Sequence, residues 1–291
     1  MIIGDSVLVQ CGDEIFRPSD KGKLVKLADT WTLRFNTGVT TTLYGNPEFL
    51  TYTDYKENWE RFNNIDRSTV FGPRHIFLFE KKRWESIVNL PDYTSGFGMF
   101  DINNNDFAKF AASFCYRAKV VKSRPNYYAV EKKRMPEVPL FITQIFGALN
   151  IDDDEKNFYF RKCWVTELLD AIFDFTNHLS IPDDMIFEAP DDWWEAYFMG
   201  LRESVYCDNS SKVYEMPSSL SDYISELSVV ASRIGQPFSV RLKDSSFIKV
   251  LLDKSYPNIQ IDYGYKNSGV QELYDIGKGE FNISGVIIRD L

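Results

Sequence analysis

The sequence predicts a mixed α+β fold, and three observations support this class. Short runs of alternating apolar and polar residues near the N-terminus indicate strands, because successive side chains of a strand point to opposite faces. Apolar residues spaced three or four apart through the middle of the chain indicate helices. Toward the C-terminus the two patterns alternate, which predicts a β-α-β-α-β segment. We therefore expect a small N-terminal β-module, a helical middle and a C-terminal α/β segment.

Residues 1–46 are predicted to form a small sheet or barrel. Trp31, Leu33 and Phe35 alternate with polar residues, and a second alternating run follows the sequence Asn-Thr-Gly. A glycine-containing turn between two alternating runs is typical of a β-hairpin. Small barrels serve many functions, so this module by itself indicates none.

Residues 47–135 are predicted to form a mixed α/β region that is rich in basic side chains. The apolar run at 75–79 indicates a buried strand. Residues 106–117 indicate a helix, because Phe107, Phe110 and Phe114 would share one face.

Residues 136–235 are predicted to form an acidic helical region. Asp152 with Glu155 resembles a capping box that would open a long apolar helix. A second helix is expected to begin near Pro190, because proline favours the first helical turn. A third helix is predicted over 219–234, since a glycine and a proline follow it.

Residues 236–291 are predicted to form the C-terminal α/β segment. A short helix is expected near 247–252, and Ser268 with Gln271 resembles the capping box of another helix. Strands before, between and after these helices would pair in parallel through right-handed crossovers.

Composition excludes several classes of protein. The chain has 291 residues, 44% apolar, with a formal net charge of −9. It has no stretch of about 18 apolar residues, so no membrane partner is expected. The start has no signal-peptide pattern, which predicts a cytoplasmic location, or a virion if the protein is a phage component. The four cysteines have no close spacing and are expected to be reduced thiols.

Motifs for cofactor, metal or nucleophilic chemistry are lacking in the sequence. The two histidines, His75 and His178, lie far from any cysteine, so neither a metal site nor a cofactor is predicted. The acidic run at 152–155 lacks the spacing of a Ca²⁺-binding loop. The phosphate-binding loop and the serine nucleophile elbow are also missing. A non-enzymatic protein is therefore expected.

Charge is unevenly distributed along the chain. Residues 61–135 carry 14 Lys or Arg and 7 Asp or Glu, whereas residues 136–223 carry 5 and 18. Three interpretations are open. The two blocks form solvated or mutually neutralising faces, or they form complementary surfaces between protein subunits, or the basic block binds nucleic acid.

The assembly interpretation predicts a structural protein, such as a phage virion or tail component, that forms homo-oligomers or binds a protein partner. Its proposed interface comprises Lys81, Lys82, Arg83, Trp193 and Trp194. Tryptophan is enriched at the centres of interfaces. Because adjacent residues on one helix point in different directions, one of the two tryptophans is expected to face outward.

The nucleic-acid interpretation has two forms. A single-strand binder would use basic and aromatic side chains together, and the candidates are Arg117, Lys119, Lys122, Arg124, Tyr127 and Tyr128. A nuclease would resemble a PD-(D/E)xK-type site, in which Asp66 and Glu80 hold a divalent cation and Lys82 positions water.

Overall fold

A computed structural model of the chain describes residues 1–5, 8–54, 56–71, 84–89, 99–133, 135, 140, 151–161, 164–204, 206–208, 213–234, 239–242, 247–251, 259–283 and 285–290. The chain divides into two compact units. Unit 1 comprises Met1–Glu80 with Pro217–Leu291, and unit 2 comprises Lys81–Met216. Both units contain helices and antiparallel strands, which confirms the mixed α+β class. Among the described helices, none has the length and apolar character needed to span a bilayer.

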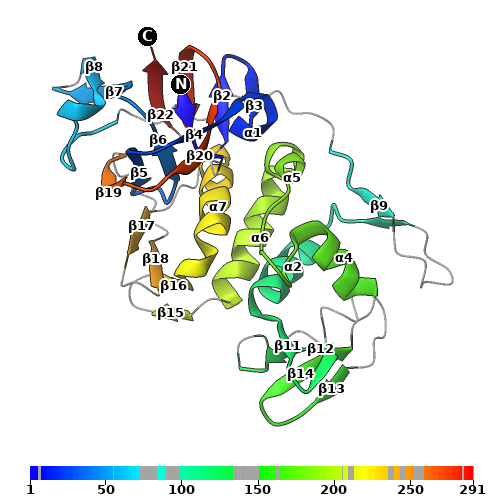
Figure 1. The fold of residues 1–291 in the computed structure, drawn as a ribbon. Coiled ribbons are helices and arrows are strands. Elements are labelled where there is room, and N and C mark those ends of the chain that lie inside the picture. The colour runs from blue at the N-terminus through cyan, green and yellow to red at the C-terminus, as the bar shows by residue number, and fades with distance from the viewer. Residues whose placement is uncertain are drawn as a thin grey trace. The chain divides into compact units, whose positions relative to one another are not determined.

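Two six-stranded sheets make up much of unit 1, and each combines strands from both ends of the chain (Figure 1). In spatial order the first sheet contains β19 (Ile261–Asn267), β5 (Thr30–Phe35), β6 (Thr40–Leu43), β1 (Ile2–Ile3), β20 (Gln271–Asp275) and β4 (Lys23–Leu27). The second contains β3 (Glu14–Phe16), β2 (Val9–Cys11), β21 (Gly279–Ile283), β22 (Val286–Asp290), β7 (Glu48–Thr53) and β8 (Lys56–Arg61). Apolar side chains from both sheets form one core.

The hairpin predicted in the N-terminal β-module is confirmed. Trp31 of β5 lies opposite Leu43 of β6, and Gly38 in the turn has a φ of 92°. Glycine adopts this left-handed conformation without steric cost. Alternation then directs Leu33 and Phe35 into the core, where both are buried.

The C-terminal β-α-β-α-β prediction is wrong, because both of its helices are strands. Residues predicted as a short helix form β18 (Phe247–Leu251), which pairs with β17 (Ser239–Leu242). The residues after Ser268 form β20, which pairs with β1 on one side and β4 on the other. The described pairs are antiparallel, so the expected parallel pairing is also wrong. Pairing with distant strands outweighs the local capping signal.

Helix α7 (Ser221–Arg233) confirms the helix predicted over 219–234. It packs on the β5–β6 turn: the Ser225 hydroxyl donates to the Gly38 carbonyl at 3.0 Å, and the Ser228 hydroxyl donates to the Thr37 carbonyl. The remaining described elements of unit 1 are α1 (Pro18–Lys21) and two 3₁₀ turns, Phe62–Asn64 and Ser218–Leu220.

Unit 2 contains two long helices together with β-hairpins and shorter helices. Its described elements, in chain order, are β9 (Ile87–Asn89), β10 (Met99–Asp101), α2 (Asn105–Arg117), β11 (Lys119–Val121), β12 (Arg124–Glu131), β13 (Ile151–Asp153), β14 (Asn157–Arg161), α4 (Trp164–Phe173), α5 (Asp183–Glu188), α6 (Asp191–Ser204), β15 (Tyr206–Asp208) and β16 (Val213–Pro217). Helices α2 and α6 lie where the sequence predicts them, whereas the strand predicted at 75–79 lies outside the described residues.

Helices α2 and α6 pack at very close range. A Cβ atom added to Gly200 would lie 2.0 Å from the carbonyl oxygen of Lys109, so only glycine fits at this position. The Ser113 hydroxyl donates to the Gly200 carbonyl at 2.8 Å, and Lys109 forms an ion pair with Glu203 at 3.0 Å. These contacts fix α2, and α2 in turn supports the neighbouring sheet.

The acidic segment at 152–155 begins no helix. It closes the hairpin between β13 and β14, and the following helix, α4, begins only at Trp164. The Asp154 carboxylate accepts hydrogen bonds from the backbone N–H groups of Lys156 and Asn157. Such a side-chain turn competes with helix formation, which explains why the predicted capping box fails.

Candidate functional site

The four-stranded sheet of unit 2, in the order β11-β12-β14-β13, has one buried face and one open face. Tyr128, Val130 and Phe160 on the inner face are at most 4% exposed. Phe114 of α2 packs against this face, with its ring centroid 5.3 Å from that of Phe160. These inner-face residues therefore belong to the core, and the opposite face is the more accessible of the two.

The open face follows from the register of the strands, because directly opposed residues of an antiparallel pair share a face. Ala129 lies opposite Lys119 on one side and Tyr159 on the other. Tyr127 lies opposite Arg161, and Tyr159 lies opposite Asp152. The open face, completed by alternation, carries Lys119, Tyr127, Ala129, Glu131, Asp152, Asn157, Tyr159 and Arg161.

Arg124 joins this face because β12 is irregular at its start. The register between β11 and β12 shifts after Val120, where Pro125 has no N–H to donate to the ladder. The Arg124 guanidinium lies 5.8 Å from the ring centroid of Tyr127. Positive charge thus gathers at the end of the sheet where β12 begins and β14 ends at Arg161.

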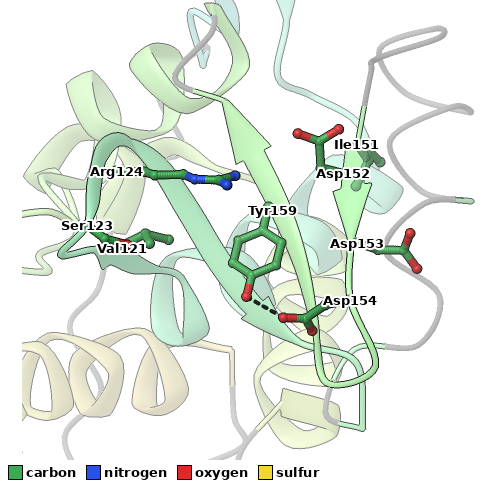
Figure 2. A pocket seen from close by; sticks show the side chains of 8 residues that line it. All are labelled: Val121, Ser123, Arg124, Ile151, Asp152, Asp153, Asp154 and Tyr159. Atoms are coloured by element: carbon green, nitrogen blue, oxygen red, sulfur yellow. Dashed lines mark hydrogen bonds between the residues drawn. The ribbon is translucent and has the colours of Figure 1, made fainter.

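A pocket of about 640 Å³ opens beside this face (Figure 2). In Figure 2, Arg124 on β12 and Asp152 on β13 lie on either side of β14, the strand that carries Tyr159. The lining residues are Val121, Ser123, Arg124, Ile151, Asp152, Asp153, Asp154 and Tyr159. The volume is in the range of pockets that bind small molecules.

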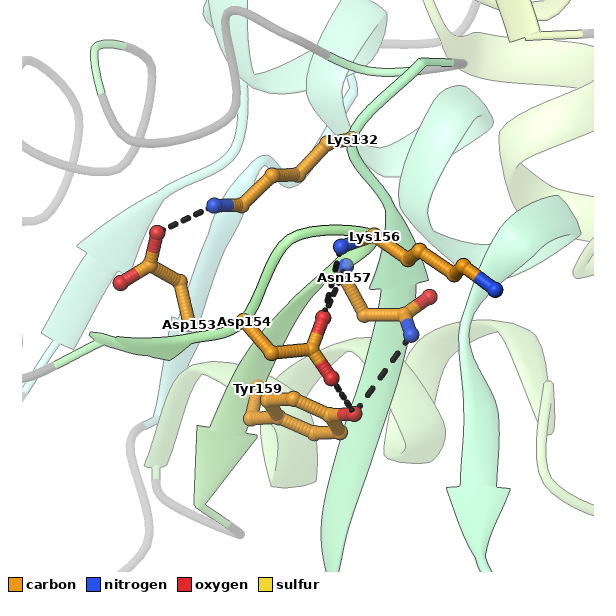
Figure 3. Close-up of polar contacts among 6 residues, drawn as sticks. All are labelled: Lys132, Asp153, Asp154, Lys156, Asn157 and Tyr159. Atoms are coloured by element: carbon orange, nitrogen blue, oxygen red, sulfur yellow. Dashed lines mark hydrogen bonds and ion pairs between the residues drawn. The ribbon is translucent and has the colours of Figure 1, made fainter.

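A hydrogen-bond network fixes the acidic side of the pocket (Figure 3). Asp154 accepts from the backbone N–H groups of Lys156 at 2.8 Å and Asn157 at 2.7 Å. The Tyr159 hydroxyl donates to Asp154 Oδ2 at 2.6 Å. The Tyr159 hydrogen bond, followed by the backbone donors, lowers the pKa of Asp154 to about 2. The same bond raises the pKa of Tyr159.

Acid is expected to break this turn at an unusually low pH. Because the pKa of Asp154 is lowered to about 2, its stabilising contribution is complete above the ordinary aspartate pKa of about 3.9 and is lost as the pH falls through about 2. The measurement is the amide NMR shift of Asn157, followed from about pH 5 downward. In Asp154→Asn this pH-dependent change of the Asn157 amide shift should disappear. A midpoint near pH 4 in the wild type would contradict the turn.

Of the three neighbouring aspartates, only Asp152 keeps both carboxylate oxygens free. Asp153 is paired with Lys132, and Asp154 is occupied by the turn (Figure 3). Arg124 contacts Tyr127 and forms no ion pair with an acidic side chain among the described residues. Across the described ranges, no three His, Cys, Asp or Glu side chains are grouped to hold a metal ion. Among its described lining residues, the pocket therefore offers the Arg124 cation and the Asp152 carboxylate to a ligand.

The structure separates the predicted nucleic-acid residues into two groups. Lys119, Lys122 and Arg124 are exposed, and Tyr127 is partly exposed. Tyr128 is only 4% exposed and packs against Phe114 and Phe175, so its prediction as a binding residue is wrong. Arg117 is partly exposed, and its Nε–H donates to the Ser204 carbonyl at the end of α6, so its role as a binding residue stays a prediction.

The predicted apolar anchor of the assembly interface is wrong. Trp193 and Trp194 are both 0% exposed. The Trp193 indole donates to the Ile102 carbonyl at 2.8 Å, and the Trp194 indole donates to the Met185 carbonyl at 3.3 Å. Because other elements cover both sides of α6, neither tryptophan faces outward. The three basic interface residues, 81–83, lie outside the described residues.

The nuclease candidates are not brought together by the described residues. Asp66 lies in an exposed turn, where its Oδ1 accepts from the Ser68 N–H at 2.8 Å and from the Ser68 hydroxyl. These hydrogen bonds lower its pKa. Glu80 and Lys82 lie outside the described residues, so this hypothesis stays a prediction.

Asp152, Tyr159 and Arg161 are among the open-face residues that the sequence analysis did not select as binding candidates. The signal was present, because Asn157, Tyr159 and Arg161 alternate with two phenylalanines as strand residues do. The apolar residues that follow have helical spacing, so the sequence predicts one long helix from Asp152 onward that includes the residues of β14.

No known protein-family model matches this chain, and no curated protein matches it either. The chemistry of the open face is therefore the basis for function.

Proposed function

We propose that the protein binds single-stranded nucleic acid through the open face of the sheet β11-β12-β14-β13. The observation that carries this proposal is the arrangement of Arg124, Arg161 and Tyr127 at one end of that face. Lys119 and Lys122 extend the positive charge along β11 and its turn. Cations beside aromatic rings are the combination that single-strand grooves use.

Each part of this surface has a physical role in the proposal. Arginine and lysine neutralise phosphates and release counterions, which supplies sequence-independent affinity. The Tyr127 ring offers a face on which an unpaired base can stack. The sheet is held rigidly from behind by Phe114 and α2, so the side chains are positioned before binding.

The acidic end of the sheet limits where a nucleic-acid strand can cross it. Glu131 lies opposite Asn157 at the end of the sheet away from Arg161, and the turn formed by Asp154 lies at this same end. A phosphate chain would be repelled there. The proposed path therefore crosses the sheet at its basic end, over Tyr127.

The test is the binding of a fluorescently labelled 20-nucleotide strand, measured by anisotropy between about 50 and 200 mM salt. Three phosphate contacts should give a log–log slope near −2, at about 0.7 per contact. The double variant Arg124→Glu with Arg161→Glu should weaken binding by at least about tenfold and reduce the slope by about 1.4.

The matched control reverses Lys23 and Lys56, which are exposed on strands of unit 1. Lys23→Glu with Lys56→Glu has the same change in net charge and should leave affinity nearly unchanged. Circular dichroism checks that both variants fold. Absence of binding at about 50 mM salt, equal losses in the two variants, or a preference for duplex would each contradict the proposal.

A second candidate function is assembly with other proteins, including the predicted virion or phage tail role. The observation that favours it is the β9–β10 ribbon, where Ile87 is 63% exposed and Met99 is 65% exposed on the same face. Large apolar side chains exposed together are typical of protein contacts. Sedimentation of the purified chain tests it: an oligomer that Ile87→Ser with Met99→Ser dissociates would support assembly, and a monomer without any bound protein would contradict it.

A further inference from the structure

We infer that the pocket beside β14 takes one base of the bound strand and selects guanine through Asp152. This inference rests on the proposed binding of single-stranded nucleic acid. It adds a sequence preference to a surface whose other contacts are with phosphates and ring faces.

The first step is the hydrogen-bonding capacity of the pocket. Lys132 neutralises Asp153, and the turn occupies Asp154. Asp152 is exposed in the edge strand β13, and its carboxylate forms no hydrogen bond or ion pair with the described residues. Of the lining carboxylates that the structure describes, it is the one with both oxygens open to new hydrogen bonds.

The second step is the placement of the two charges. Arg124 is on β12 and Asp152 is on β13, with β14 between them, and both residues line the same pocket. A nucleotide is bipolar, with its phosphate at one end and its base edge at the other. Arg124 would hold the phosphate while Asp152 meets the base.

The third step is the surface between these two charges. Tyr159 lies directly opposite Asp152 on the open face, and its hydroxyl is held by Asp154 at 2.6 Å (Figure 2). A ring fixed in this way is a stacking surface that loses little entropy on binding. The base would lie on Tyr159 with its edge toward Asp152.

The choice of guanine follows from donor geometry. The pairing edge of guanine presents two adjacent donors, N1–H and the N2 amino group, which match the two oxygens of a carboxylate. Adenine and cytosine each present one amino group beside an acceptor nitrogen, and thymine presents one N–H between two acceptors. A carboxylate repels those acceptors, so guanine is the base that Asp152 favours.

The test compares labelled oligothymidine strands that carry a single central guanine, inosine, adenine, cytosine or thymine. The guanine strand should bind about tenfold more tightly than the thymine strand. Inosine lacks the N2 amino group and should lose most of this advantage. In Asp152→Ala the five strands should bind with equal affinity.

The matched control is Asp153→Ala, which removes the same charge from the next residue. It should raise the affinity of every strand by a similar factor and leave the guanine preference intact. Equal binding of all five strands to the wild type, or a guanine preference that survives Asp152→Ala, would overturn the inference while the proposed function stands. If no strand binds at all, the proposed function itself fails.

Discussion

Gly200→Ala is expected to destabilise unit 2 by at least about 3 kcal/mol. Overpacking a well-packed interior usually costs about 1–3 kcal/mol, when side chains can move aside. Here the added methyl group would lie 2.0 Å from the backbone oxygen of Lys109, and backbone cannot rotate away. Helices α2 and α6 would have to separate, which would also strain the Ser113 bond to the Gly200 carbonyl. Urea unfolding followed by circular dichroism measures the loss.

The matched control is Gly269→Ala, because no atom lies within 4 Å of a Cβ built at that position. It makes the same chemical change and should alter stability by less than about 1 kcal/mol. If Gly200→Ala unfolds at the same urea concentration as the wild type, the close packing of the two helices is wrong.

Trp193→Ala is expected to cost about 3–5 kcal/mol, the range for removing a large buried aromatic side chain. The Trp193 ring stacks on Tyr197 at 5.5 Å and meets Trp84 edge-on at 5.5 Å, so its removal leaves a cavity lined by other rings. Trp193→Phe fills most of that space and should cost much less. Unchanged unfolding of Trp193→Ala, together with a changed sedimentation coefficient, would instead restore Trp193 as an interface residue.

Local patterns predicted the elements whose residues contact one another within a short stretch of chain. Helix α2 follows from its phenylalanine spacing and from Asn104, whose side chain accepts from the backbone N–H groups of Asp106 and Phe107. The β5–β6 hairpin follows from alternation on both sides of a glycine turn. In each case the local preference and the final packing agree.

The elements that the sequence predicts wrongly depend on contacts outside their own local stretch of chain. Strand β20 exists because β1 and β4 flank it, and both come from the far end of the chain. Its local sequence, Ser268 followed by Gln271, favours a helix equally well. Strand β14 pairs with its hairpin neighbour β13 and also with β12 from an earlier part of the chain. Pairing with strands outside the local stretch contributed to both elements, and a single-sequence pattern does not contain it.

The candidate site could be predicted only as a segment. Composition marks residues 117–128 as basic and aromatic. The sequence pattern predicts both adjacent tyrosines as binding residues, although Tyr127 belongs to the open face and Tyr128 to the core. Which tyrosine is available depends on the register of β12 against β14, and that register is a property of the folded sheet.

Unit 1 is assembled from both ends of the chain, and this has a consequence for the order of folding during synthesis. Ile2 pairs with Asp275, and Gln10 pairs with Asn282, so both sheets depend on residues that are synthesised long after β1 and β2. Contacts so distant in sequence make folding slow. Unit 2 lies within one continuous stretch and can fold while unit 1 is still incomplete. Until β20 and β21 emerge, β1 and β2 each have only one of their two strand partners, β6 and β3, and their open edges expose the nascent chain to aggregation.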